Sequence, residues 1–331
     1  MPLLSKFKQS VKRSQLINAN DTIVIGVSGG PDSVCLVYLL RALQKEYGLT
    51  LSIAHLDHML RGKDSEKDAR FVFELSEKLK IPAFFKKVAI AKLAQKGSFE
   101  ELARKERFDF FFETAKKVGA KKIALGHTLD DQAETVLMRM LRGSGLMGLA
   151  GILPRKKMGD FVIIRPLLEI QRSEIETFLR LRKITPRIDI TNQSEVYLRN
   201  RIRHKLLGEL KKYNPNIKTV LAATAEHIAL DYDYLLAAGS KAFQAIKTIE
   251  TGSCVRLDLK KFFLLHPALQ NLALRFTFER LKGDTRRLTA RHIKEIKDMV
   301  YNRPIGSIVD LPFKISLRLD KTSLCAYFRG R

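Results

Sequence analysis

The sequence predicts an α/β protein in which a parallel-sheet domain precedes a smaller, mainly helical C-terminal domain. Short β-branched apolar runs alternate with helical patterns through the first half of the chain, as in right-handed βαβ crossovers. After about residue 170 the patterns become mostly helical. A length of 331 residues is also too great for one ordinary domain and indicates two.

The sheet is expected to begin with residues 22–27 (TIVIGV), a β-branched apolar run. This run stops at Ser28-Gly29-Gly30-Pro31, and a helix is expected over 33–46. Further strands are predicted at 51–55, 83–88, 123–126 and 161–165. Further helices are predicted at 66–80, 98–118 and 130–142. Ligands of such parallel sheets bind beyond the carboxyl ends of the strands.

The rest of the chain is expected to be mostly helical, with a small β element at its end. Helical patterns cover 172–183, 195–212, 215–247, 266–281 and 289–301. The terminal strands are predicted at 308–311, 314–319 and 323–328. The turn-like sequence Tyr213-Asn214-Pro215 follows a basic helix, so we expect one domain at 1–213 and another at 214–331.

Charge is the strongest global signal. Sixty Lys and Arg residues against 35 Asp and Glu residues give a net charge of +25. Such an excess favours polyanionic partners, nucleic acid above all, because their binding releases counterions. A solvated basic surface is the alternative interpretation.

The sequence gives no membrane or secretion signal and few cysteines. No stretch reaches the roughly 18 consecutive apolar residues of a membrane span, and no apolar segment follows the basic residues at the start. Cys35, Cys254 and Cys325 are odd in number and far apart, which argues against a disulfide framework or a CxxC site. We therefore expect a cytoplasmic protein without a membrane partner.

The segment Ser28-Gly29-Gly30-Pro31-Asp32-Ser33 lies between the first expected strand and a helix, the arrangement of a phosphate cradle. Glycines let the backbone approach an oxyanion, and helix-start N–H groups favour negative charge. The segment has neither the Walker nor the GxGxxG spacing. The structural alternative is a tight strand–helix turn capped by Ser or Asp.

SGGPDS resembles the PP-loop of the N-type ATP pyrophosphatases, which cleave ATP between the α- and β-phosphates. Further motifs follow in order: HLDHMLR at 55–61, EELARKERF at 100–108, GHTLDDQAET at 126–135, RPLL at 165–168, DITN at 189–192 and RNRIR at 199–203. Together they resemble the tRNA(Ile)-lysidine synthetase family over about 20–210, and the remainder resembles the first C-terminal domain of its short form.

This resemblance implies an adenine-nucleotide alpha-hydrolase-like (PP-loop) domain that uses ATP and Mg²⁺. The implied reaction adenylates C2 of the wobble cytidine in the CAU anticodon of tRNA(Ile), and free lysine then displaces AMP to give lysidine. The amino-acid identity of the tRNA changes from Met to Ile. On this basis the nucleotide is held by the SGGPDS residues together with His55, Asp57, Gly126 and His127.

The resemblance also assigns chemistry to carboxylates. Asp32, Asp131 and Glu134 are the expected catalytic residues, and Asp130 with Asp131 the expected Mg²⁺ ligands. Their spacing puts both aspartates on the helix face of Glu134, where they suit either Mg²⁺ or a cationic lysine. The alternative is that these acidic residues only complement the dipole of a helix N-terminus.

Two histidines follow the second expected strand. His55, Asp57 and His58 offer metal-ligand types, but alternate strand residues point to opposite faces, which argues against zinc. A structural histidine remains an alternative to a role in the nucleotide pocket.

Arginines are the expected tRNA contacts. Arg104 and Arg107 lie one helical turn apart and suit a phosphate or nucleotide clamp, with surface ion pairing as the alternative. Arg199, Arg201 and Arg203 belong to a basic stripe that suits the tRNA backbone, with a solvated face as the alternative.

Other functions are weaker interpretations. A PP-loop tRNA thiolase generally needs cysteines for persulfide or an iron–sulfur cluster, and an amidotransferase needs a glutaminase domain. A non-catalytic RNA-binding protein is disfavoured by the intact SGGPDS and DDxxE motifs. The oligomeric state, a homodimer included, and the means of telling tRNA(Ile) from tRNA(Met) are left open.

Overall fold

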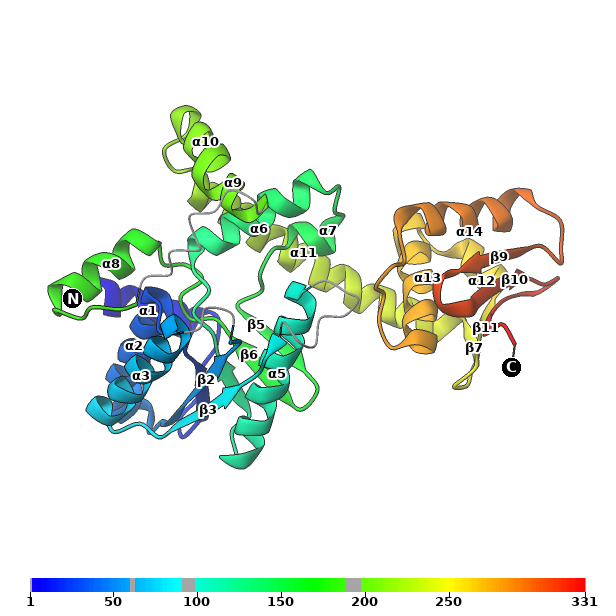
Figure 1. The fold of residues 1–331 in the computed structure, drawn as a ribbon. Coiled ribbons are helices and arrows are strands. Elements are labelled where there is room, and N and C mark those ends of the chain that lie inside the picture. The colour runs from blue at the N-terminus through cyan, green and yellow to red at the C-terminus, as the bar shows by residue number, and fades with distance from the viewer. Residues whose placement is uncertain (1, 60–62, 91–98, 188–197, 331) are drawn as a thin grey trace. The chain divides into compact units, whose positions relative to one another are not determined.

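The structure is a computed structural model that describes residues 2–59, 63–90, 99–187 and 198–330 (Figure 1). The chain divides into two units, Met1–Ala229 and Leu230–Arg331. The division falls inside helix α11 (Ile217–Ile246), and the boundary expected from the sequence lies just before this helix.

The first unit is built on a six-stranded sheet in the order β3-β2-β1-β4-β6-β5. Its strands are β1 (Thr22–Gly26), β2 (Thr50–Asp57), β3 (Ala83–Lys87), β4 (Lys122–Ala124), β5 (Arg155–Met158) and β6 (Phe161–Ile164). The neighbours from β3 to β6 are parallel, as predicted, whereas β5 pairs antiparallel with β6. The sequence RKKM of β5 is basic instead of apolar, so it gives no strand signal.

Helices cover both faces of this sheet. Successive side chains of β1 point to opposite faces and so enter different apolar layers. Ile23 and Ile25 pack into one apolar layer, and Val24 packs into the layer on the other face. The first layer is covered by α1 (Pro2–Arg13), α2 (Pro31–Tyr47), α3 (Lys63–Leu79) and α8 (Arg172–Leu181). Helix α5 (Phe99–Lys117) covers the opposite face with its phenylalanines. The α/β fold predicted from the sequence is confirmed, with α1 as an addition.

A small helical cluster packs on α6 (Leu129–Leu141). It consists of α7 (Leu146–Leu149), α9 (Leu198–Arg201), a π-helical turn (Ile202–Leu206), α10 (Leu207–Tyr213) and the start of α11. Ala133 and Leu137 of α6 form an apolar core with Ile202 and Leu207. The helix predicted over 195–212 is thus present from 198 as three consecutive pieces, and residues 195–197 lie outside the described ranges. This packing brings α9 and the π-helical turn against α6.

The order of the strands reverses between β1 and β4, so the loops after these strands flank one crevice. Gly126 lies in the loop after β4. A Cβ there would come within 3.1 Å of the Asp32 carbonyl carbon and the Ser33 nitrogen. Glycine therefore lets the start of α2 lie directly against the loop after β4.

The second unit combines a five-stranded antiparallel sheet with helices. The strands are β7 (Lys247–Glu250), β8 (Cys254–Asp258), β9 (Ile308–Leu311), β10 (Ile315–Leu319) and β11 (Ser323–Phe328), in the order β7-β8-β11-β10-β9. The helices α12 (Leu259–Leu264), α13 (Pro267–Lys282) and α14 (Ala290–Asn302) accompany them. This sheet is larger than the small β element predicted. Strands β7 and β8 were not predicted, because they are short and lack an apolar run.

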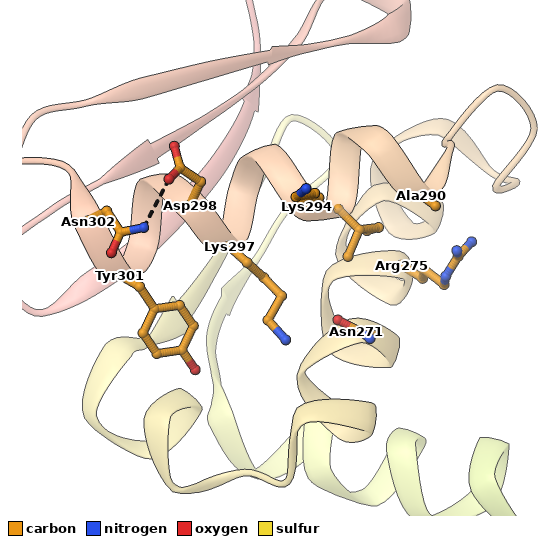
Figure 2. Close-up of a pocket in the computed structure, with 9 residues that line it drawn as sticks. Asn271, Arg275, Ala290, Lys294, Lys297, Asp298, Tyr301 and Asn302 are labelled. Atoms are coloured by element: carbon orange, nitrogen blue, oxygen red, sulfur yellow. Dashed lines mark hydrogen bonds between the residues drawn. The ribbon is translucent and has the colours of Figure 1, made fainter.

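Helices α13 and α14 border a cavity of about 580 Å³ in this unit. Figure 2 shows Asn271 of α13 together with Lys297 and Tyr301 of α14 at its edge. None of the helices in the described part of the chain is long and apolar enough to cross a membrane.

The close approach at Gly126 gives a test. Gly126→Ala should lower the free energy of unfolding by roughly 1–3 kcal/mol, because the atoms it meets are backbone and cannot move aside. Gly208→Ala is the matched control, since its Cβ would meet nothing within 4 Å and alanine favours the helix. Urea unfolding measures both. Equal midpoints for the two variants would contradict the proposed packing.

Candidate functional site

The loop between β1 and α2 leads into a helix start whose first-turn N–H groups belong to Asp32 and Ser33, since Pro31 has none. Within the loop, the Ser28 and Gly30 N–H groups already donate to the Ser33 and Ser28 hydroxyls. Gly29 has a φ of 92°, a left-handed conformation that favours glycine. Helix α2 then begins at Pro31, and its N-cap residue Gly30 makes no side-chain cap hydrogen bond. The Ser33 hydroxyl donates to the Gly30 carbonyl at 3.0 Å and fixes the loop. The first-turn N–H groups of α2 are therefore available to an anion.

Asp32 lies in the first turn of α2 and has one oxygen unused. Its Oδ2 accepts from Nη2 of Arg172 at 3.1 Å, whereas its buried Oδ1 has no partner among the described residues. Burial raises the pKa of Asp32 to about 6, although Arg172 opposes the shift. This carboxylate is held poorly solvated beside the loop.

The two strand-end histidines, His55 and His127, each leave a buried ring nitrogen unpartnered within the described part of the chain. Nδ1 of His55 lies 2.8 Å from the Val27 carbonyl and must donate to it, so Nε2 is left as an acceptor. Burial lowers the pKa of His55. Burial, reinforced by Arg165, lowers the pKa of His127 to about 4, and its Nδ1 has no partner. Both rings are neutral near pH 7.

The other residues of the HLDH stretch have structural partners. Oδ1 of Asp57 accepts from the Met59 backbone at 2.7 Å. Nη2 of Arg107 lies 3.2 Å from Nε2 of His58, and burial lowers the pKa of His58 to about 4. Within the described ranges, no group of three His, Cys, Asp or Glu residues is placed to hold a metal ion.

Helix α6 begins with a capping box that uses one of the predicted catalytic carboxylates. Oδ2 of Asp131 accepts from the Thr128 backbone at 2.9 Å, and the Thr128 hydroxyl accepts from the Asp131 backbone at 3.3 Å. Oδ1 of Asp131 is left facing the guanidinium groups of Arg172 (3.9 Å) and Arg203 (3.8 Å). One oxygen of Asp131 therefore caps the helix, and the other faces the site.

Asp130 has no free oxygen. Its Oδ2 accepts from the Arg172 backbone at 2.8 Å, and its Oδ1 is ion-paired with Nζ of Lys218. Burial alone would raise the pKa of Asp130, but these hydrogen bonds lower it. The sequence predicts Asp130 as a Mg²⁺ ligand, and its occupied oxygens do not favour that role.

Glu134 is 1% exposed and is held by two arginines. Arg203 donates from Nε to Oε1 at 2.6 Å and from Nη2 to Oε2 at 3.0 Å, and Arg199 donates from Nε to Oε2 at 3.1 Å. The sequence predicts Arg199 and Arg203 as tRNA contacts, yet both guanidinium groups point to a buried carboxylate. Arg201, from the same stripe, is exposed.

The arginines of α5 lie near the same end of the sheet. The guanidinium of Arg104 lies over the ring of Phe108, 4.9 Å from its centroid. Burial lowers the pKa of Arg107, and the nearby charge of Arg104 acts in the same direction. Both residues keep exposed surface, so either can reach a bound nucleic acid.

Three basic residues of the site had no sequence signal. Arg172 contacts Asp32 and Asp131 from the start of α8. The Arg187 backbone donates to the Gly29 carbonyl at 3.0 Å, and Lys218 pairs with Asp130 from α11. They come from distant parts of the chain and belong to no motif. Arg61 and the DITN stretch at 189–192, part of the family resemblance, lie outside the described residues.

Comparison with known proteins gives consistent matches. The PP-loop domain family matches residues 3–210. The tRNA(Ile)-lysidine synthase of Clostridioides difficile is 37% identical over 97% of this chain and 70% of its own. That of Dehalococcoides mccartyi is 37% identical over 96% of this chain and 69% of its own.

A solved structure supports the fold. The U34-tRNA thiolase NcsA from Methanococcus maripaludis, with its [4Fe-4S] cluster, aligns with a TM-score of 0.56 at 21% identity. The match covers 68% of this chain and 78% of that chain. At this identity the likeness concerns the fold alone.

The raised pKa of Asp32 predicts a pH-dependent stability. A carboxyl whose pKa rises on folding stabilises the protein below its unfolded pKa, near 4, and that contribution is lost as the pH rises through about 6. Asp32→Asn should therefore raise the free energy of unfolding at pH 8 by about 2–3 kcal/mol, and by little below pH 4. Thermal melts across pH measure this.

Asp130→Asn is the control of opposite sign, because the pKa of Asp130 is lowered on folding. It should destabilise the protein at pH 8, and its effect should fade as the pH falls. An Asp32→Asn protein less stable than the wild type at pH 8 would contradict the proposed burial of this charge.

Proposed function

The chain belongs to the tRNA(Ile)-lysidine synthase family, with a PP-loop domain, and from this premise we propose how its residues divide the work of the reaction. It is an ATP-using ligase that forms lysidine on tRNA(Ile). One observation carries this assignment of roles. An uncapped helix start, two neutral histidines and carboxylates held by arginines lie together at one end of the sheet.

ATP is proposed to bind with its β- and γ-phosphates in the loop from Ser28 to Ser33. The uncapped N–H groups of α2 and the dipole of a 17-residue helix favour that charge. The neutral His55 offers Nε2 as an acceptor, which suits the amino group of adenine. Cleavage between the α- and β-phosphates passes AMP to the C2 oxygen of the wobble cytidine and leaves pyrophosphate in the loop.

The oxygen donors present fit Mg²⁺. Asp32 has an unpartnered buried Oδ1, and Asp131 keeps Oδ1 outside its capping box. Mg²⁺ typically takes one or two carboxylates and completes its shell with substrate phosphates and water. We propose Asp32 and Asp131 as the residues that would hold it. The ion would neutralise charge on the phosphates.

Lysine is proposed to enter the ion-pair network around Glu134. Free lysine carries both a carboxylate and ammonium groups, so it can replace one guanidinium at Glu134 and pair with the guanidinium that it displaces. Arg199 is the exchangeable partner, because its side chain is 43% exposed whereas that of Arg203 is 20% exposed. The exchange leaves no buried charge unpaired, which would otherwise cost several kcal/mol.

The attack of the lysine amine then forms the C2–N bond. The attacking amine must be neutral, so it gives up a proton before or during the step. AMP leaves with the oxygen of C2, and the base becomes lysidine. Arg201, Arg104 and Arg107 are proposed to hold the RNA backbone.

The thiolase alternative finds no support in the cysteines. Cys35 is buried inside the first unit, and Cys254 and Cys325 lie in the second unit with their Sγ atoms 3.4 Å apart. Burial raises the pKa of Cys35 to about 12, so its thiol is unreactive.

The reaction itself is tested with labelled lysine. Protein, ATP, labelled lysine and total tRNA should yield label in the isoleucine tRNA with a CAU anticodon, with AMP and pyrophosphate formed in equal amounts. Asp131→Asn should slow this by on the order of 10²-fold or more, the scale of positioned charged groups. Label that enters no tRNA, or enters it without ATP, would refute the proposal.

The proposed lysine site is tested by comparing two arginines of one stripe. Arg203→Gln should raise KM for lysine by on the order of tenfold, because Arg203 orients Glu134. Arg201→Gln should leave KM for lysine unchanged and reduce the salt slope of tRNA binding by about one. Steady-state kinetics and tRNA binding against salt measure these effects.

Loss of fold is the main confounder for Arg203→Gln. The double variant Glu134→Gln/Arg203→Gln removes both charges and should recover stability but not lysine affinity. Recovery of lysine KM in the double variant, or equal KM changes in the two single variants, would contradict the lysine site.

A further inference from the structure

The first unit also holds a group of cations that have no acidic partner among the residues that the structure describes. It consists of Arg104 on α5, Arg139 on α6, Lys156 on β5 and Arg165 after β6, and is called here the cation cluster. Among the described residues no ion pair joins any of these four side chains to a carboxylate. Arg172, Arg199 and Arg203 of the same unit are each paired with carboxylates, so the absence of such partners here points to a ligand.

Two of these guanidinium groups are anchored on one short segment. Nη1 of Arg139 donates to the carbonyls of Gly148 and Gly151, at 2.7 Å each, and Nη1 of Arg165 donates to that of Leu153 at 2.6 Å. The segment is itself held on α6, because the Ile152 backbone donates to Oε1 of Gln132 at 2.6 Å. Carbonyls orient a guanidinium without neutralising it, so both charges are fixed in place and uncompensated.

Arg165 makes the strongest case. It is only 5% exposed, and its buried Nε has no hydrogen-bond partner in the described part of the chain. Guanidinium groups offer five donors in a planar fork that matches the oxygens of a phosphate. A buried arginine with an unused donor and no carboxylate is therefore prepared for an anion.

The four charges lie close enough to disturb one another. Burial, reinforced by the charge of Arg104, lowers the pKa of Arg165 to about 10. Burial, Arg165, Arg104 and Arg139 together lower the pKa of Lys156. An anion bound among these groups would reduce their mutual repulsion.

The surface beside the cation cluster is apolar. Met140, Leu141, Leu146 and Met147, at the end of α6 and in α7, are each 44–65% exposed. Arg139 precedes the first two, and its carbonyl partner Gly148 follows the last. Proteins that bind single-stranded nucleic acid place cations along the backbone and side chains, usually aromatic, against the bases. Here the exposed side chains are aliphatic, so they offer a base apolar contact instead of ring stacking.

We infer that the cation cluster binds a backbone phosphate of the RNA substrate, with an adjoining unstacked base against the apolar residues of α6 and α7. This rests on the proposed function. The nucleotide phosphates of ATP are the other source of the same chemistry. The ATP phosphates are already assigned to the loop before α2. The cation cluster, in contrast, is open to solvent at Arg104 and Lys156, which are both exposed.

The test compares neighbouring lysines of β5. Successive strand residues point to opposite faces, so Lys157→Gln is the matched control for Lys156→Gln, and both lysines are exposed. The full-length protein is titrated with an anticodon stem-loop RNA carrying CAU over a range of salt, and separately with ATP. Arg104→Gln serves as a second cluster variant.

Lys156→Gln and Arg104→Gln should each weaken RNA binding on the order of tenfold at low salt and reduce the salt slope by about 0.7, with the ATP Kd unchanged. Lys157→Gln should match the wild type. A loss of ATP affinity with RNA affinity intact would assign the cluster to the nucleotide and overturn the inference. Equal effects of Lys156→Gln and Lys157→Gln would contradict a specific site, because they would show that the basic surface attracts RNA non-specifically.

Failure of the proposed function is distinguishable from failure of this site. A wild-type protein that binds no CAU stem-loop and transfers no lysine would refute both the function and this occupant before any variant is made. A wild type that forms lysidine, with cluster variants that bind RNA like the control, would refute the site alone.

Discussion

The buried carboxylate of Glu134 is the constraint on which the proposed active site of the first unit depends. An ionised carboxylate at 1% exposure is tenable only when its oxygens are fully hydrogen-bonded to cations, and Arg199 and Arg203 supply those bonds. The two arginines come from α9 and from the π-helical turn, so the ion pairs and the apolar core beneath them fix these elements on α6. The carboxylate thus organises both the local fold and the site.

The catalytic end of the sheet is divided by charge. On one side, Asp32, Asp130, Asp131 and Glu134 are matched by basic partners from α8, α9, the π-helical turn and α11. On the other side, the cation cluster has no acidic partner among the described residues. The paired side suits a zwitterionic amino acid, which exchanges with existing pairs, and the unpaired side suits a polyanion. The net charge of +25 is therefore organised locally as well as spread over the surface.

The sequence predicted what depends on local pattern and missed what depends on tertiary contact. The parallel strands, the loop before α2 and the acidic start of α6 follow from apolar runs, glycine positions and helix-start chemistry. Strand β5 was missed because its residues are basic and it is held by pairing with β6. Arg172 and Arg165 were missed as site residues because only the fold brings them to their partners. The same fold turns Arg199 and Arg203 inward, which a basic stripe in a sequence cannot reveal.

Unsatisfied groups at this site are also a store of free energy for binding. Among the described residues, Oδ1 of Asp32, Nε of Arg165 and one ring nitrogen each of His55 and His127 have no hydrogen-bond partner. Buried polar groups without a partner lower the stability of a protein. A ligand that satisfies them binds the folded state alone, so its binding energy adds to stability in proportion to the logarithm of its concentration. Because the proposed phosphate loop, the carboxylates and the cation cluster lie in one unit, the charges proposed to meet the substrates are already in place in the free protein. That preorganisation reduces the free-energy cost of orienting ATP, lysine and RNA for the two proposed steps, adenylation of the cytidine and displacement of AMP by lysine.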